Sequence, residues 1–200
     1  MLINLLSFKK DYLNGTVFLL IFTLIICLTS TIISNAQQPE LPSVNLPILI
    51  TSCGQSIDAN IVSLLARRIN LKYTYKPLAK AEEIEGFKTL IFVIGGSGKG
   101  LGDAGIDVPD EIKRCEELLK KAKEKNIYIL GMHIGGETRR GPVSADFIPF
   151  AAEVDYLIIR EDGNKDGYFT KVASEKKIPL YTIKQSIELQ ELLKKIFNVE

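Results

Sequence analysis

The sequence predicts an α/β fold: a three-layer sandwich with a mainly parallel sheet, flavodoxin-like or Rossmann-like in type. From residue 47 onward, short β-branched apolar runs alternate with segments of helical periodicity, the pattern of a parallel sheet covered on both faces. Loops rich in Gly, Ser, Asn, Asp, Arg or His follow four of the runs. Because the carboxyl ends of parallel strands share one edge, these loops are expected to converge there. The order of the strands stays open.

The expected strands are residues 47–51, 72–75, 89–94, 127–132, 156–159 and 180–183. Helices are expected between them. An apolar stripe predicts a helix over residues 59–70, with Asp58 as its cap. Pro109 marks the start of a second helix over residues 110–125, and residues 187–197 form the last. A further helix over residues 144–153 stays open, because Pro149 would remove one backbone hydrogen bond from it.

The sequence predicts an export signal before this domain. Lys9 and Lys10 stand before an apolar run over residues 17–33, and small residues lead up to Ala36. This pattern predicts a signal peptide over residues 1–36, cleaved after Ala36. An uncleaved amino-terminal anchor is the alternative, and it would be the protein's only contact with a membrane. In both cases the remaining chain is secreted or extracytoplasmic.

Residues 37–46 contain Pro39 and Pro42 and are expected to form a short tether, which leaves residues 47–200 as a single α/β domain. Without Lys9, Lys10 and Asp11, the basic residues fall from 25 to 23 and the acidic ones from 24 to 23, so the remaining chain is formally neutral. No basic stripe is left to suggest a nucleic-acid partner.

A glycine-rich segment at residues 95–107 is the longest of the polar loops. Such a backbone can turn its amides inward as an anion nest, beside the positive charge of Lys99. It is not a Walker A loop, because Gly100 follows Lys99 where that motif has Ser or Thr. The glycines at residues 100, 102 and 105 match GxGxxG, but they lie well past the strand and the next helix begins only near residue 109, so the geometry of a dinucleotide site is missing. A bound phosphate or carboxylate and a loop that only permits close packing both remain open. The ligand-binding residues expected here are Gly95, Gly96, Ser97, Lys99, Gly100 and Asp107.

The loop after the first strand contains Cys53 between Ser52 and Gln55, just before a helix. Free amides and the helix dipole there could hold an anion, contacted by Ser52 and Gln55, or lower the pKa of Cys53. His133, the only histidine, ends another strand; it could act as the base for a Cys53 nucleophile and is also among the expected ligand-binding residues. Plain packing of both residues is the competing interpretation.

Two adjacent arginines, Arg139 and Arg140, follow His133 on the third loop. Arginines on such a loop can form bidentate bonds to a carboxylate or a phosphate. One of the two arginines could instead form a structural ion pair across the crevice with Asp103, Asp107 or Asp146.

The fourth loop matches the opening of a calcium loop, DxNxDG, at Asp162, Asn164 and Asp166. Ala173 replaces the glutamate at the twelfth position, so calcium, the one cofactor indicated, would bind a degenerate site. The alternative is a polar turn in which Asp166 caps the following helix; Asn164 and Asp166 are also among the expected ligand-binding residues.

Cys115 shares a helical face with Ile112, Leu119 and Ala122, which indicates core packing. Cys53 and Cys115 would lie in a compartment where disulfides form, so a bridge between them stays open.

Three motifs together resemble an exported bacterial family known only as a domain of unknown function. They are GGSGKGLGDAGID at residues 95–107, HIGGETRRG at 133–141 and GNKDGYFT at 163–170. The resemblance covers residues 47 to the end and implies no reaction, ligand or cofactor.

We therefore expect an exported domain that binds a small anionic ligand at the carboxyl edge of its sheet. One alternative is a hydrolase or acyl transferase that uses Cys53 and His133. Another is a structural or interaction module at the cell surface, in which calcium stiffens the last loop.

Overall fold

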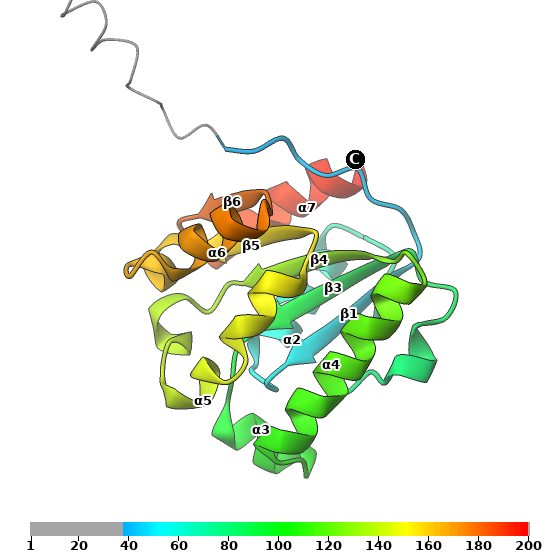
Figure 1. Ribbon diagram of the computed structural model, residues 1–200. Coiled ribbons are helices and arrows are strands. Elements are labelled where there is room, and N and C mark those ends of the chain that lie inside the picture. Colours follow the sequence, from blue (N-terminus) through cyan, green and yellow to red (C-terminus); the bar gives the residue numbers. More distant parts are fainter. Residues whose placement is uncertain (1–37, 200) are drawn as a thin grey trace, which may run out of the picture. The chain divides into compact units, whose positions relative to one another are not determined.

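A computed structural model describes residues 38–199 and shows six parallel strands in the order β2-β1-β3-β4-β5-β6 (Figure 1). The strands are β1 (Ile48–Cys53), β2 (Thr74–Tyr75), β3 (Thr89–Ile94), β4 (Tyr128–His133), β5 (Tyr156–Arg160) and β6 (Leu180–Ile183). The first five follow the flavodoxin-like order, which decides between the two expected types. The strand order reverses between β1 and β3: β2 lies on one side of β1, whereas β3 to β6 follow one another on the other side.

Helices cover both faces of the sheet. The α-helices are α2 (Asp58–Arg68), α3 (Gly98–Ala104), α4 (Val108–Glu124), α5 (Pro142–Ala145), α6 (Tyr168–Lys176) and α7 (Leu189–Phe197). The 3-10 turns are η1 (Ala81–Ile84), η2 (Gly136–Arg139), η3 (Ile148–Glu153), η4 (Glu161–Asn164) and η5 (Ser186–Glu188).

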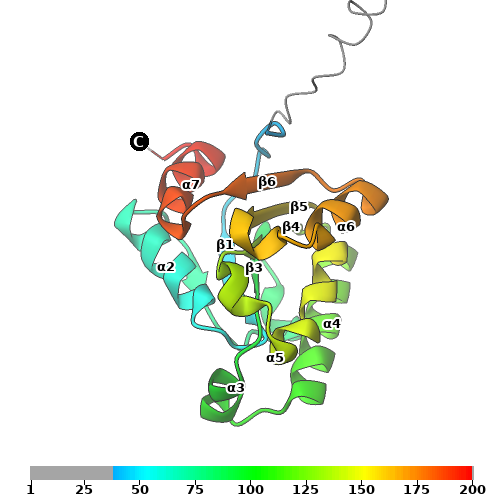
Figure 2. The same cartoon turned by 90° about the vertical axis from the view of Figure 1, so that its left-hand side faces the viewer.

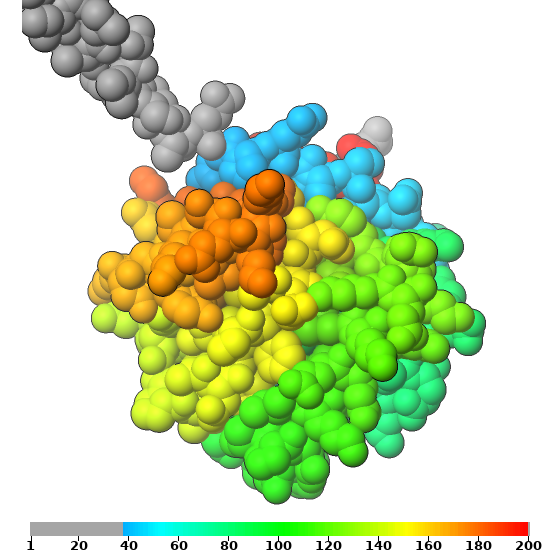
Figure 3. Space-filling model, viewed as in Figure 1, coloured from blue at the N-terminus to red at the C-terminus, as the bar shows by residue number. Residues whose placement is uncertain are grey.

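Two hydrophobic cores lie on opposite sides of the sheet. On one side α2 and α7 bury residues such as Val62 and Leu193 against it. On the other side α4, η3 and α6 contribute Leu118, Ile148 and Phe169. Figure 2 shows the sheet between these layers, and Figure 3 shows the second layer as a continuous surface from α4 to α6. The three-layer α/β sandwich predicted from the sequence is confirmed.

The central strands β1 and β3 are buried along their whole length, with Ile48 paired to Thr89 and Cys53 to Ile94. Burial on both faces explains why these runs are apolar at every position rather than at every second one. Because all strands are parallel, the loops after β1, β3, β4 and β5 leave from the same edge of the sheet.

Three expectations about individual elements need correction. Asp58 is the first residue of α2 and Ile57 is its cap, so the Asp58 carboxylate is free for another role. The glycine-rich segment is not all loop, because α3 forms inside it, with the Ser97 hydroxyl accepting from Gly100 N at 3.1 Å. The second strand is shorter than expected and begins at Thr74. Around Pro149, where the sequence leaves a helix open, the chain forms the 3-10 turn η3 with Pro149 in its first turn.

Residues 38–46, expected as a tether, lie along the domain. The Gln38 side chain bonds both the backbone N–H and the carbonyl of Thr182 on the edge strand β6, each at 3.0 Å. Leu41 and Val44 pack against the core beneath α2 and α7. The predicted signal peptide falls outside the described residues. Among residues 38–199, no helix has the length and apolar character needed to cross a bilayer.

Candidate functional site

The loops that follow β1, β3, β4 and β5 bind one another at the carboxyl edge. Ser97 N donates to Gly54 O at 2.8 Å, and Gly96 N donates to the Ser144 hydroxyl at 3.0 Å. Arg140, in the third loop, pairs with Asp166 of the fourth. Segments far apart in the sequence therefore meet along the carboxyl edge of the sheet, on the lower left side of the molecule in Figure 1.

The gap between β1 and β3, where the strand order reverses, is closed by backbone hydrogen bonds. Gly95 N donates to Cys53 O at 2.9 Å, and Ser56 N donates to Gly95 O at 3.2 Å. A β-bridge joins Gln55 to Gly96. The usual ligand position of an open α/β sheet is thus filled by the two loops themselves.

The glycine-rich segment is closely packed. A Cβ on Gly96 would lie 2.4 Å from Val143 O, and one on Gly100 would lie 1.8 Å from Gln55 O. The amides of Gly95, Gly96, Ser97 and Gly100 all donate within the protein. These contacts favour the interpretation that the glycines permit close packing. Lys99 lies exposed on α3.

Other side chains proposed for ligand binding also have partners in the fold. Gln55 Nε2 donates to Pro77 O at 3.1 Å and to Glu111 at 2.9 Å. Asp107 caps α4 through Asp110 N at 2.9 Å. The Ser52 hydroxyl is buried and has no hydrogen-bond partner among the described residues.

Arg139 forms an internal ion pair with Asp58. Its Nε lies 3.1 Å from Asp58 Oδ2, which also accepts from the Ser56 hydroxyl at 3.0 Å. The Asp58 side chain is 5% exposed, and a Cβ on Gly135 would lie 2.4 Å from its carboxylate. The sequence named Asp103, Asp107 and Asp146 as possible partners; the observed partner, Asp58, lies 81 residues away in the chain.

His133 is fully buried at the end of β4. Its Nδ1 donates to Ile94 O at 3.0 Å, its ring lies 4.8 Å from the Phe169 ring, and its Nε2 has no hydrogen-bond partner among residues 38–199. Burial lowers the pKa of His133 below its ordinary value, so the ring is neutral near pH 7.

The surroundings of Cys53 do not support the catalytic hypothesis. Cys53 and His133 lie on the same face of the sheet, but Ile94 of β3 stands between them, so two strand spacings of about 4.8 Å each separate them. Cys53 is fully buried, and burial, followed by contact with Cys115, raises the pKa of its thiol well above the ordinary value. A nucleophilic cysteine needs an accessible thiolate with an adjacent base, and this thiol has neither.

The fourth loop uses its acids for ion pairs. Asp162 accepts two bonds from Arg160, at 2.6 and 2.7 Å, and this pairing lowers the pKa of the Asp162 carboxyl. Asn164 accepts from Phe169 N at 2.9 Å at the start of α6, and Asp166 accepts from Tyr168 N at 3.2 Å. The structure thus fits the polar turn better than the calcium loop, and no cluster of three or more metal-ligating acids, histidines or cysteines occurs in residues 38–199.

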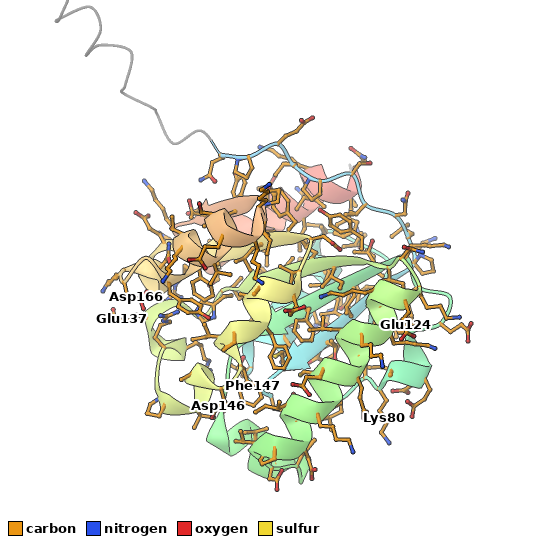
Figure 4. The ribbon with its side chains drawn as sticks, in the orientation of Figure 1. Lys80, Glu124, Glu137, Asp146, Phe147 and Asp166 are labelled. Atoms are coloured by element: carbon orange, nitrogen blue, oxygen red, sulfur yellow. The ribbon has the colours of Figure 1, made fainter. Side chains whose placement is uncertain are left out.

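Arg140 is in a different situation from its neighbours. Its guanidinium carbon lies 5.4 Å from the centre of the Tyr168 ring and 5.1 Å from that of Phe169. Its Nη2 pairs with Asp166, whereas its Nη1 is buried without a hydrogen-bond partner among the described residues. The Asp166 side chain is 57% exposed, and Figure 4 places it at the margin of the molecule.

A buried ion pair that the sequence analysis missed lies beneath the β1 loop. Arg114 on α4 donates to both oxygens of Glu111, each at 2.7 Å, and the two side chains are 8% and 0% exposed. Glu111 in turn accepts from Gly54 N at 2.9 Å. A signal was present: Glu111 and Arg114 fall on the same helical face as Cys115 and Leu118, where charges are not expected.

Comparison with known proteins identifies a family. Residues 45–197 match the profile of the family described as Domain of unknown function (DUF6305). No curated protein matches the chain. The solved structures that are similar include a putative lipolytic protein of the G-D-S-L family from Desulfitobacterium hafniense DCB-2, with 10% identity, TM-score 0.32, and coverage of 68% of this chain and 75% of that one. The psychrotrophic esterase EstA from Pseudoalteromonas sp. shares 13% identity at TM-score 0.30, over 74% of this chain and 92% of its own. The SGNH-hydrolase family esterase AlinE4 shares 11% identity at TM-score 0.31, over 75% and 80%. Similarity this low says nothing about activity.

Proposed function

The chain belongs to the family described as Domain of unknown function (DUF6305), and we propose that it binds a small anionic molecule through Arg140. The observation that carries this proposal is the state of the Arg140 guanidinium. Two aromatic rings hold it, an exposed carboxylate occupies one of its nitrogens, and the other nitrogen is buried with no acceptor among the described residues.

A buried guanidinium N–H without an acceptor is unfavourable, at about 1–3 kcal/mol or more for a charged group. A ligand carboxylate or phosphate that displaces Asp166 offers two oxygens, and it would bond both ends of the guanidinium fork once that displacement exposes Nη1. The Tyr168 and Phe169 rings lie next to the guanidinium, and cation–π attraction stabilises its charge there. The site therefore favours a planar carboxylate or a phosphate group.

Asp166 is a displaceable partner in this arrangement. Its side chain is 57% exposed, and ion pairs at such surfaces contribute about 0–1 kcal/mol. A ligand that bonds Arg140 at both nitrogens would gain more than the Asp166 carboxylate does. The neighbouring acids Glu137 and Asp162 are paired with Lys165 and Arg160, so they do not compete for Arg140.

Isothermal titration of the folded protein with panels of carboxylates and phosphate esters tests the proposal. We expect at least one compound to bind, and Arg140→Ala to weaken its binding by tenfold or more, which corresponds to about 1.4 kcal/mol. Arg140→Lys keeps the charge but loses the fork, so its affinity should be intermediate. Arg68→Ala is the matched control, because Arg68 is exposed at the end of α2.

The proposal fails if no compound in either panel binds while circular dichroism shows the protein folded. It also fails if Arg140→Ala binds as tightly as the unaltered chain. A loss of affinity in Arg68→Ala of the same size would show that the effect is one of net charge.

Export remains part of the proposal. Its support is the apolar run at residues 17–33 after two lysines, which lies outside the described residues. Cell fractionation with amino-terminal sequencing of the recovered protein tests it: a chain that begins at Gln37 outside the cytoplasm is expected. Recovery of the protein in the cytoplasm would refute export.

A further inference from the structure

We infer that Cys53 and Cys115 form an oxidisable pair, which a disulfide-bearing oxidant joins into an internal cross-link between β1 and α4. This inference is independent of the proposed ligand site. Both thiols are free, and both belong to the hydrophobic core between the sheet and α4.

Two shared partners place the Cys115 sulfur beside Cys53. Arg114 Nη2 donates to Cys115 Sγ at 3.4 Å and also to Ser52 O, the carbonyl that immediately precedes Cys53. On the other side, Glu111 Oε1 accepts from Gly54 N at 2.9 Å, and Cys115 Sγ lies 3.8 Å from the same oxygen. The residues before and after Cys53 are thus both bonded to groups that touch Cys115.

The side-chain directions agree with this placement. Cys53 belongs to the same core as Leu118 and Leu119, which are on the α4 side of the sheet, and Cys115 lies one helical turn before them on the buried face of α4. Both sulfurs are fully buried. Direct contact between the thiols also explains why Cys115 is the first group after burial to raise the pKa of Cys53.

The chemistry is a thiol–disulfide exchange in two steps. One cysteine, after losing its proton, attacks the oxidant's disulfide to form a mixed disulfide and release one oxidant thiolate. The second cysteine, also deprotonated, attacks the mixed disulfide, so the Cys53–Cys115 bond forms and the second oxidant thiolate leaves. The two protons pass to the released thiolates, and the oxidant is reduced by the two electrons that the protein loses.

Burial determines when the exchange takes place. Neither sulfur is exposed in the folded domain, so an oxidant reaches them while the chain folds or during global opening. Once formed, the cross-link closes the long loop between residues 53 and 115. A loop of about 60 residues predicts a rise in Tm of roughly 10 °C for a domain of this size.

The test uses the full chain carrying Cys27→Ser, so that the two core thiols are the only ones left. The protein is unfolded in urea and refolded either with a mixture of oxidised and reduced glutathione or with reductant alone. Each sample is then denatured, treated with N-ethylmaleimide, digested and analysed by mass spectrometry, and the melting temperature of each refolded sample is measured. The same chain with Cys115→Ser is the control.

We expect the oxidised sample to contain linked Cys53 and Cys115 peptides, two hydrogens lighter than their sum and without maleimide, and to melt higher than the reduced sample. The Cys115→Ser control should be alkylated at Cys53 and should melt at the same temperature under both conditions. Two results would overturn the inference: both thiols still alkylated after oxidative refolding, or a linked protein that melts below the reduced one.

Discussion

Replacing Gly100 by alanine should destabilise the protein, whereas the same change at Gly102 should stabilise it. Both glycines lie in α3, two residues apart. A Cβ on Gly100 would lie 1.8 Å from Gln55 O, whereas one on Gly102 would have nothing within 4 Å. The pair therefore separates the packing role of the glycine-rich segment from its helix propensity.

The expected magnitudes follow from these distances. Alanine in a helix interior is about 1 kcal/mol more favourable than glycine, so Gly102→Ala should gain up to that amount. Gly100→Ala has the same gain, but α3 must move away from the Gln55 carbonyl by more than an ångström. Overpacking costs about 1–3 kcal/mol, and a clash with backbone falls at the upper end. The two variants should differ by this steric cost, or roughly 6–12 °C in Tm.

Urea denaturation followed by circular dichroism measures both variants against the unaltered chain. If Gly100→Ala proves as stable as Gly102→Ala, the close contact between α3 and the β1 loop does not exist in solution. The glycines would then be available as the anion nest that the sequence suggested.

Three further predictions concern the charged groups. Arg114→Ala leaves the fully buried Glu111 carboxylate without its partner, so it should lower the free energy of unfolding by about 3–5 kcal/mol. Lys171→Ala breaks only the exposed pair with Glu175 and should change that free energy by at most about 0.5 kcal/mol in the same urea titration. Because burial lowers the pKa of His133, this side chain is protonated below about pH 6.5 in the unfolded chain but stays neutral in the folded chain. Unfolding free energies measured between about pH 7 and pH 5 should therefore fall with decreasing pH, by at most about 1.4 kcal/mol per pH unit, and His133→Asn should flatten this dependence. Asp166→Asn should free Arg140 and raise the affinity for the anion found by titration by up to about fivefold; a lower affinity would show that Asp166 itself contacts the ligand.

The fold could be predicted because its signals are local. The runs at residues 48–53 and 89–94 are apolar at every position, and only a strand buried on both faces needs that pattern. Pro109 lies in the first turn of α4, where its fixed backbone angle and missing N–H are tolerated. The strand order could not be predicted in this way, because it depends on which strands pair across the chain.

The site was harder to predict because its contacts are long-range. The sequence suggested that Arg139 or Arg140 forms an ion pair with an aspartate, but nothing local shows that the partner is Asp58. Asp58 was assigned instead to the cap of a helix. The Glu111–Arg114 pair did have a local signal, namely two charges on an apolar helical face.

Two ion pairs, one buried and one partly buried, flank the place where open α/β sheets usually bind a ligand, and the proposed ligand position lies away from it. The Asp58–Arg139 pair lies at the start of α2 and the Glu111–Arg114 pair at the start of α4, so they flank the gap between β1 and β3 from the two helical layers. Backbone bonds between the β1 and β3 loops close that gap. Among the described residues, a buried guanidinium nitrogen without a hydrogen-bond partner is found only at Arg140, beyond the end of β4. Arg139 and Arg140 are adjacent, but the fold pairs only the first with Asp58 at the sheet edge; the second is the residue that we propose for ligand binding.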